Sequence, residues 1–413
     1  MSTDPVVIVA ARRTPIGAFQ GALSDVSATQ LGATAVAAAV ADSGVDSADV
    51  GRVLMGCVLP AGLGQAPARQ AALGGGLPKG VPCSTVNKMC GSGMEALVLG
   101  HDLIAAGSAA VVVAGGLESM TNAPYLMPKA RKGYRMGHQE VLDHMFYDGL
   151  QDIYEGHMMG HFAEATSQKY GFTREDQDAF AIESVTRATR AAGDGSFDAE
   201  IVPVTVKTRR GEHTVSEDEV PGTVSVDKIP KLRPAFAKDG TVTAASSSSI
   251  SDGAAALVIM RASEAEKRGL QPLARIVGHS AFAHEPAWFT TAPVDALKLL
   301  QEDLGWTPDD VDIYEINEAF ACVTMAAMKD VGIDHAKVNV NGGACALGHP
   351  IGATGARITT TWLHAMRARN LTRGLATQCI GGGEATAVAL EIDSEQPWIS
   401  RLPGPSFPAA PQG

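Results

Sequence analysis

Length, composition and charge set the first limits on this chain. It has 413 residues, of which 45% are hydrophobic, only 5% are aromatic and 45 are glycine. Such a composition is typical of a packed α/β protein of two or three domains and excludes a disordered or fibrous chain. The formal net charge of −12 argues against nucleic-acid binding. There is no secretory leader, no peroxisomal tripeptide and no membrane-length apolar run, so we expect a cytoplasmic protein.

The chain repeats itself. Three stretches of the first part reappear in the same order in the last part: residues 44–50 resemble 305–311, residues 86–93 resemble 338–343, and residues 110–118 resemble 376–384. The offsets between the copies are nearly constant, and a duplicated α/β unit explains them.

The repeats divide the chain into two halves with an insertion between them. We predict an N-terminal half over residues 1–119 with 251–271, and a C-terminal half over residues 272–393. Residues 120–250 hold most of the Met and His clusters and read as an inserted loop domain that covers a site. Residues 394–413 are rich in Pro, Ser and Gly and are expected to form a frayed tail.

Cys90 is the first candidate functional residue. Gly91 and Gly93 remove side chains that would crowd a ligand near the sulfur, and an apolar helix is predicted to begin at this point. The positive end of that helix dipole would lower the pKa of the thiol and favour a nucleophilic thiolate. A small buried structural cysteine is the alternative interpretation. The six cysteines form no Cys-x-x-Cys pair, which indicates neither a zinc site nor a disulfide framework.

Two basic clusters lie within the predicted insertion. An anionic ligand would need such a local patch on an acidic protein, although a solvated loop is the favoured interpretation of either cluster alone. The clusters are Lys129, Arg131, Lys132 and Arg135, and Lys228, Lys231 and Arg233.

Three motifs in the last part of the chain carry further candidates. Asn317 follows a predicted buried strand, where α/β sheets place their ligands, although an Asx turn is possible there. His349 stands among five glycines before Pro350, a setting that suits proton transfer near pH 7 better than a satisfied core histidine. Cys379 ends the last glycine-rich strand, where it could act as an acid/base while the backbone N–H of Gly381 binds an oxyanion.

These motifs together resemble the thiolase family, and within it the acetyl-CoA C-acetyltransferases. The resemblance runs from about residue 6 to residue 392 and includes residues 10–17 and 116–124. It implies a five-layer αβαβα fold built from two duplicated halves. It also implies a homodimer or homotetramer that takes acetyl-CoA and CoA as substrates, without a cofactor or a metal.

The resemblance assigns roles to the candidates. Cys90 would be the nucleophile and acyl carrier, and His349 its base and an oxyanion donor. Cys379 would be the second acid/base, Asn317 would hold a water at an oxyanion, and Gly381 would donate its backbone N–H. The implied substrate-binding residues are Ser248, which would contact the pantetheine arm, and Leu150, Met158, Met159, Phe289, Ala319 and Phe320.

Three positions depart from the pattern of short-chain thiolases. Met158 replaces the usual pocket histidine, Phe289 lies in a divergent pocket segment, and Pro221 aligns with an arginine that is often near the adenosine phosphates. These departures leave open a 3-ketoacyl-CoA thiolase of fatty-acid β-oxidation that prefers longer chains. The complete set of catalytic positions disfavours a CoA-binding protein without catalysis, and Cys379 disfavours a ketoacyl synthase. A dinucleotide-binding protein is disfavoured because no Gly-x-Gly-x-x-Gly follows the first predicted strand.

Overall fold

A large mixed sheet organises the protein. The computed structural model describes residues 4–209 and 211–393, so the tail predicted over residues 394–413 lies outside the described residues. Within that part of the chain, ten strands join in one sheet, and the prediction of a mixed α/β fold is confirmed. The sheet strands are β1 (Val6–Arg13), β2 (Gly17–Ala18), β3 (Arg52–Gly56), β4 (Cys83–Val86), β5 (Val111–Ser119), β10 (Ser251–Arg261), β11 (Ala274–Ala283), β12 (Ile313–Ile316), β13 (Arg373–Ile380) and β14 (Glu384–Glu391).

The strand order reproduces the sequence repeat. In the first half β1 pairs antiparallel with β10, β10 antiparallel with β5, and β5 parallel with β3. In the second half β11 pairs antiparallel with β14, β14 antiparallel with β13, and β13 parallel with β12. The two sets meet where β1 pairs with β11 over Val7 and Ile8. The same order of orientations in both sets follows from the repeated sequence.

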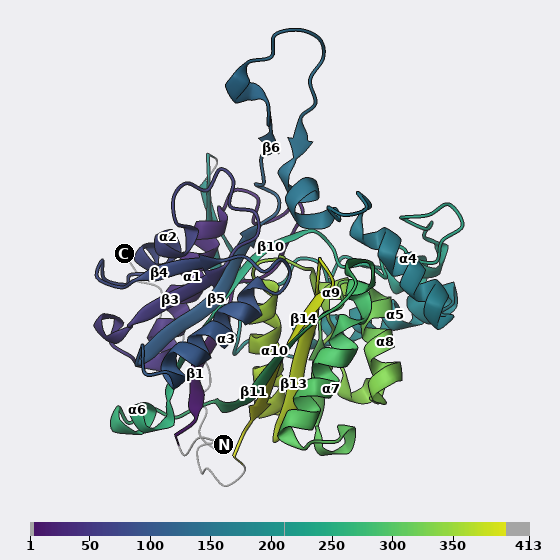
Figure 1. Cartoon of the computed structure of the whole chain (residues 1–413). Helices are drawn as coiled ribbons and strands as arrows, with labels where there is room; N and C mark the ends of the chain where they lie inside the picture. Colours follow the sequence, from purple (N-terminus) through teal and green to yellow (C-terminus); the bar gives the residue numbers. More distant parts are fainter. Residues whose placement is uncertain (1–3, 210, 394–413) are drawn as a thin grey trace.

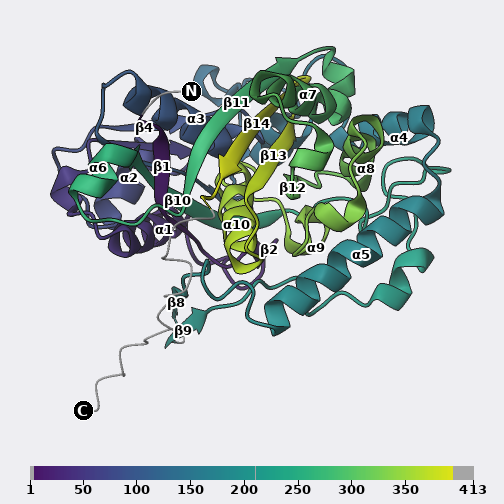
Figure 2. The same cartoon turned by 90° about the horizontal axis from the view of Figure 1, so that it is seen from below.

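Helices cover the sheet on both sides and also lie between its halves (Figures 1 and 2). Helices α1 and α2 pack on the N-terminal strands, α7 packs on the C-terminal strands and against α8, and α3 and α10 contact each other and strands of both halves. The helices are α1 (Ala28–Ser43), α2 (Pro67–Gly74), α3 (Ser92–Ala105), α6 (Ala262–Lys267), α7 (Ala292–Leu304), α8 (Ala321–Val331), α9 (Ala344–Leu347) and α10 (Thr354–Ala368). None of the described helices has both the length and the apolar character needed to cross a membrane.

Residues of the predicted insertion form helices and two small hairpins that are separate from the large sheet. The elements are β6 (Tyr125–Leu126), β7 (Leu142–Asp143), α4 (Met159–Tyr170), α5 (Arg174–Gly193), β8 (Val204–Thr208) and β9 (Gly211–Val215). The β6–β7 hairpin projects away from the body of the molecule and carries the first basic cluster (Figure 1). The insertion is tied to β1 by the fully buried Arg13, which binds Glu200 at 2.6 Å and Asp218 at 2.7 Å.

Glycines allow the two halves to touch backbone to backbone. The carbonyl oxygen of Gly352, just before α10, lies against Gly56 of β3, Gly116 of β5 and Gly93 of α3. A Cβ on Gly56 would lie 2.5 Å from that oxygen, and one on Gly116 would lie closer still. Because the obstructing atom belongs to the backbone, it cannot rotate away, and only glycine fits at these positions.

We expect Gly116→Ala to lower the free energy of unfolding by more than the ~1–3 kcal/mol typical of overpacking, because the new methyl group meets a fixed carbonyl. Urea unfolding monitored by circular dichroism measures this change. Gly80→Ala is the matched control, since a Cβ there meets nothing within 4 Å. Equal stability of the two variants would contradict the close approach.

Candidate active site

Cys90 lies on a tight turn between β4 and α3. Met89 has a φ of 47°, a left-handed conformation that is rare for such residues and often marks a functional turn. Gly91 is the N-cap of α3, so Cys90 stands just before the helix rather than at its first residue. A Cβ on Gly91 would lie 2.5 Å from Cδ1 of Ile380, so glycine lets the segment around Cys379 approach this turn.

The prediction of a lowered Cys90 pKa is wrong. Burial is the largest influence and raises the pKa of the Cys90 thiol to about 11, and the Glu118 carboxylate contributes in the same direction. The backbone N–H groups of Gly381 and of Cys90 itself face the sulfur and oppose this rise. Desolvation outweighs the dipole, so the thiol is neutral at physiological pH and needs a base to become nucleophilic.

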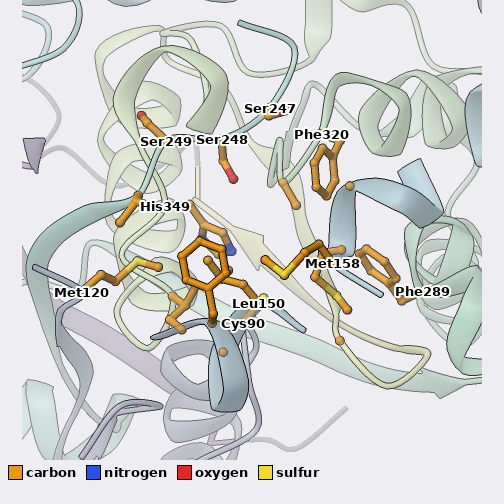
Figure 3. Close-up of a pocket in the computed structure, with 18 of the residues that line it drawn as sticks. Cys90, Met120, Leu150, Met158, Ser247, Ser248, Ser249, Phe289, Phe320 and His349 are labelled. Carbon is orange, nitrogen blue, oxygen red and sulfur yellow. The ribbon is translucent and has the colours of Figure 1, made fainter. Parts of the chain in front are cut away.

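His349 supplies a neutral imidazole beside this thiol. Its Nδ1 lies 2.6 Å from Oγ1 of Thr354, whereas its Nε2 has no hydrogen-bond partner in residues 4–209 and 211–393. Burial, together with the positive charge of Arg357, lowers the pKa of His349 to about 3. The imidazole is therefore uncharged near pH 7, which is the state required of a base. Figure 3 shows His349 and Cys90 at the same cavity.

A buried carboxylate fixes the His349 loop to the N-terminal half. Glu118, on β5, accepts hydrogen bonds from the backbone N–H groups of Val58 at 2.9 Å, Leu59 at 3.1 Å and Gly352 at 2.8 Å. Its burial raises its pKa to about 7, while these donors favour the ionised form. In the sequence Glu118 appears within a repeat and within residues 116–124, but no local pattern predicts this contact, which joins segments far apart in the chain.

Cys379 and Asn317 are not among the residues that line the cavity at Cys90 and His349. Both are buried, and Cys379 is close enough to Cys90 for the charge of Cys90 to raise the Cys379 pKa further, after the larger effect of burial. The backbone of Asn317 is held by the carbonyl of Thr377 at 3.0 Å. Neither polar atom of its side chain has a partner among the described residues, which leaves the amide free to hold a water or a substrate oxygen.

The remaining predicted site residues converge on one cavity of about 210 Å³. Its lining includes Cys90, His349, Gly381, Ser248, Leu150, Met158, Met159, Phe289, Ala319 and Phe320. Apolar side chains dominate this surface, and the thiol, the imidazole and the serine hydroxyls are its main polar groups. Ser248 points into the cavity in Figure 3.

The cavity also contains residues that the sequence did not reveal. They are Met120, Phe146, Gly149, Gly160, Phe236, Ser247, Ser249, Ile250 and Ile351. Ser247 and Ser249 flank the predicted Ser248 and could have been inferred from that run. Phe236 had no local signal, because a loop of the insertion brings it to the site. Phe146 and Gly149 belong to a π-helical turn, Phe146–Leu150, a feature frequent at functional sites.

The three positions that depart from the pattern of short-chain thiolases differ in their relation to the cavity. Met158 is the N-cap residue of α4, and Phe289 packs edge-to-face on Phe162, with ring centroids 6.3 Å apart. Pro221 does not line the cavity, and its carbonyl instead accepts a hydrogen bond from Thr189. Neither basic cluster contributes a lining residue. Among the described residues, the lining of the cavity at Cys90 therefore includes no Lys or Arg side chain.

Glu118→Gln should lower the free energy of unfolding by about 1–3 kcal/mol, because an amide cannot satisfy donors on both of its terminal atoms. Glu219→Gln is the matched control: one oxygen of Glu219 accepts from both Ala18 and Ala22, so an amide can keep both bonds. Chemical denaturation should show a clearly larger loss for Glu118→Gln. An equal loss in the two variants would contradict the role of Glu118 as a link between segments.

Alkylation of Cys90 by iodoacetamide should accelerate steadily as pH rises, because a pKa raised to about 11 leaves little thiolate below pH 9. Mass spectrometry of the Cys90 peptide follows the rate. The half-buried Cys83 provides an internal comparison in the same sample. A rate plateau at or below pH 8 would contradict the dominance of desolvation.

Comparison with known proteins gives a consistent result over the full length. Residues 6–263 match the thiolase N-terminal domain, and residues 270–392 match the thiolase C-terminal domain. An acetyl-CoA acetyltransferase of Pseudomonas aeruginosa is 49% identical over 94% of this chain and 99% of its own length, and one of Escherichia coli is 51% identical over 93% and 98%. The crystal structure of the Bacillus anthracis acetyl-CoA acetyltransferase has a TM-score of 0.92 and 42% identity, and the match covers 94% of this chain and 98% of that one. The chain therefore belongs to the thiolase family.

Proposed function

We propose that the protein is an acetyl-CoA C-acetyltransferase, which condenses two molecules of acetyl-CoA to acetoacetyl-CoA and CoA and catalyses the reverse thiolysis. The observation that carries this proposal is the meeting of a thiol, an imidazole nitrogen without a hydrogen-bond partner among the described residues, and two backbone N–H donors at one apolar cavity. The relatives named acetyl-CoA acetyltransferase support the same activity.

The first half-reaction acylates Cys90. Nε2 of His349 takes the thiol proton, and the sulfur attacks the thioester carbonyl of acetyl-CoA. The N–H groups of Cys90 and Gly381 stabilise the oxyanion of the tetrahedral intermediate, and one such donor is typically worth about 10²–10³ in rate. Collapse breaks the carbon–sulfur bond to CoA, and the leaving thiolate takes the proton of Cys379. The products are acetyl-Cys90, CoA and a Cys379 thiolate beside a protonated His349.

The second half-reaction forms the carbon–carbon bond. The Cys379 thiolate removes a proton from the methyl group of the second acetyl-CoA, and its raised pKa makes it a strong base once ionised. Protonated His349 and a water held by Asn317 stabilise the enolate oxygen. The carbanion attacks the acetyl-Cys90 carbonyl, and the Cys90 thiolate leaves and recovers its proton from His349. Both bases thus return to their initial states.

We infer the binding of the CoA arm from the same cavity. The Ser248 hydroxyl contacts the pantetheine, while Leu150, Met159, Ala319 and Phe320 enclose its apolar part. Neither basic cluster lines the cavity. We infer that any contact between these clusters and CoA is with its phosphates, far from the thioester. CoA thioesters are substrates in this scheme.

We also propose the five-layer αβαβα architecture with the division into residues 1–119 with 251–271, 120–250 and 272–393. Separate apolar clusters support it: one lies under α1 and α2, one around α3 and α10, and one under α7 and α8. We further propose that the protein forms a homodimer or homotetramer in the cytoplasm.

The acyl preference depends on Met158 and Phe289. A thiolase specific for longer 3-ketoacyl-CoAs is the second candidate, favoured by the apolar lining at these two positions. A relative in Staphylococcus aureus, 46% identical over 93% of this chain and 98% of its own length, is named a probable acetyl-CoA acyltransferase, without a chain length.

Steady-state thiolysis of acetoacetyl-CoA, measured beside that of 3-ketoacyl-CoAs of six and more carbons, tests the proposal. We expect acetoacetyl-CoA to have the highest kcat/KM. We also expect Cys90→Ala to lose at least about 10³ in kcat, since removing a nucleophile abolishes the covalent route, while Cys83→Ala retains activity. A clear preference for longer chains would favour the second candidate, and full activity of Cys90→Ala would overturn the mechanism.

A further inference from the structure

Thr354, the first residue of α10, touches the proposed base on the side away from the cavity. Its side chain is completely buried. Its Oγ1 lies 2.6 Å from Nδ1 of His349 and 2.9 Å from the carbonyl oxygen of Pro350. The hydroxyl therefore stands between one ring nitrogen and one carbonyl oxygen.

The direction in which the Thr354 hydroxyl donates its proton decides which nitrogen of the neutral His349 ring is protonated. A carbonyl oxygen can only accept, so a hydrogen bond to Pro350 uses the hydroxyl proton and leaves a lone pair facing Nδ1. Nδ1 must then be the protonated nitrogen. Nε2, which has no partner among the described residues, is left with its lone pair at the cavity, where Cys90 also lies.

Neighbouring threonines indicate the direction of the hydroxyl bond. Thr359 and Thr360, also completely buried in α10, donate to the carbonyl oxygens four residues earlier, at 2.8 Å and 2.9 Å. Thr354 has the same relation to Pro350, so its bond to that carbonyl repeats the pattern of the helix. The contact with His349 is the feature that distinguishes Thr354 from the other two.

We propose that Thr354 is a positioning residue that holds His349 in the Nδ1–H tautomer and presents Nε2 to the Cys90 thiol. The inference rests on the proposed function of His349 as the base for Cys90. A hydroxyl suits this role better than a carboxylate, because it orients the ring without an added negative charge. The protonated imidazole then stays a strong acid and returns its proton to the departing Cys90 sulfur. Arg357, whose positive charge also acts on His349, has the same effect.

The kinetic test compares Thr354→Val, which keeps the shape and removes the hydroxyl, with Thr354→Ser, which keeps the hydroxyl. For thiolysis of acetoacetyl-CoA we expect Thr354→Val to lower kcat by about 10–100-fold, the range seen when such supporting hydrogen bonds are lost, with the KM for CoA nearly unchanged. Thr354→Ser should restore most of the kcat. Thr360→Val, the matched control, removes an equivalent buried hydroxyl in the same helix and should stay close to wild type.

The direct readout is the tautomer itself, observed by solid-state ¹⁵N NMR of protein labelled at the histidine ring nitrogens. The His349 signals are identified by their loss in His349→Asn. We expect a protonated Nδ1 and an unprotonated Nε2 in the wild type and in Thr354→Ser, and a mixture of tautomers in Thr354→Val.

Two results would overturn the inference: a protonated Nε2 in the wild type, or wild-type kcat in Thr354→Val. The wild-type spectrum decides the question even if Thr354→Val does not fold. An enzyme that shows the Nδ1–H tautomer but no thiolysis would contradict the proposed function and leave the tautomer assignment standing.

Discussion

The close approach of Gly352 to the N-terminal half is the constraint on which the site depends. Its carbonyl oxygen lies against glycines of β3, β5 and α3, and its N–H donates to the buried Glu118. These contacts fix the loop that carries His349 relative to the turn that carries Cys90. The proposed nucleophile and its proposed base come from different copies of the repeat predicted from the sequence, so their relative position depends on this junction.

The same tight packing sets the protonation states of the reacting groups. Burial raises the pKa of the Cys90 thiol and lowers that of the His349 imidazole, so both are neutral in the resting protein. A neutral pair avoids the cost of holding an ion pair out of water. In the proposed mechanism ions form only during the reaction, where the N–H groups of Cys90 and Gly381 and the hydroxyl of Thr354 are already in place. The low polarity of the site thus keeps both groups neutral before the reaction begins.

The proposed acyl preference depends on residues other than those that hold Cys90 and His349 in place. Met158 and Phe289 lie in the wall of the cavity, and the insertion supplies much of that wall through Leu150, Met159 and Phe236. The predicted insertion is held to β1 separately, through the buried ion pairs of Arg13 with Glu200 and Asp218. These cavity residues are thus distinct from the glycines and Glu118 that join the two halves.

The sequence alone predicted the repeated α/β plan and ten of the residues that line the cavity. Strand and turn patterns are local, and the glycines around Cys90, His349 and Gly381 mark places where backbone must come close to something else. Only the tertiary structure shows the contacts of Glu118, Thr354 and Phe236, because their partners lie on other segments or depend on the orientation of one hydroxyl. The Cys90 pKa shows the same division: the helix dipole can be anticipated from sequence, whereas the larger desolvation depends on how the whole chain packs around the sulfur.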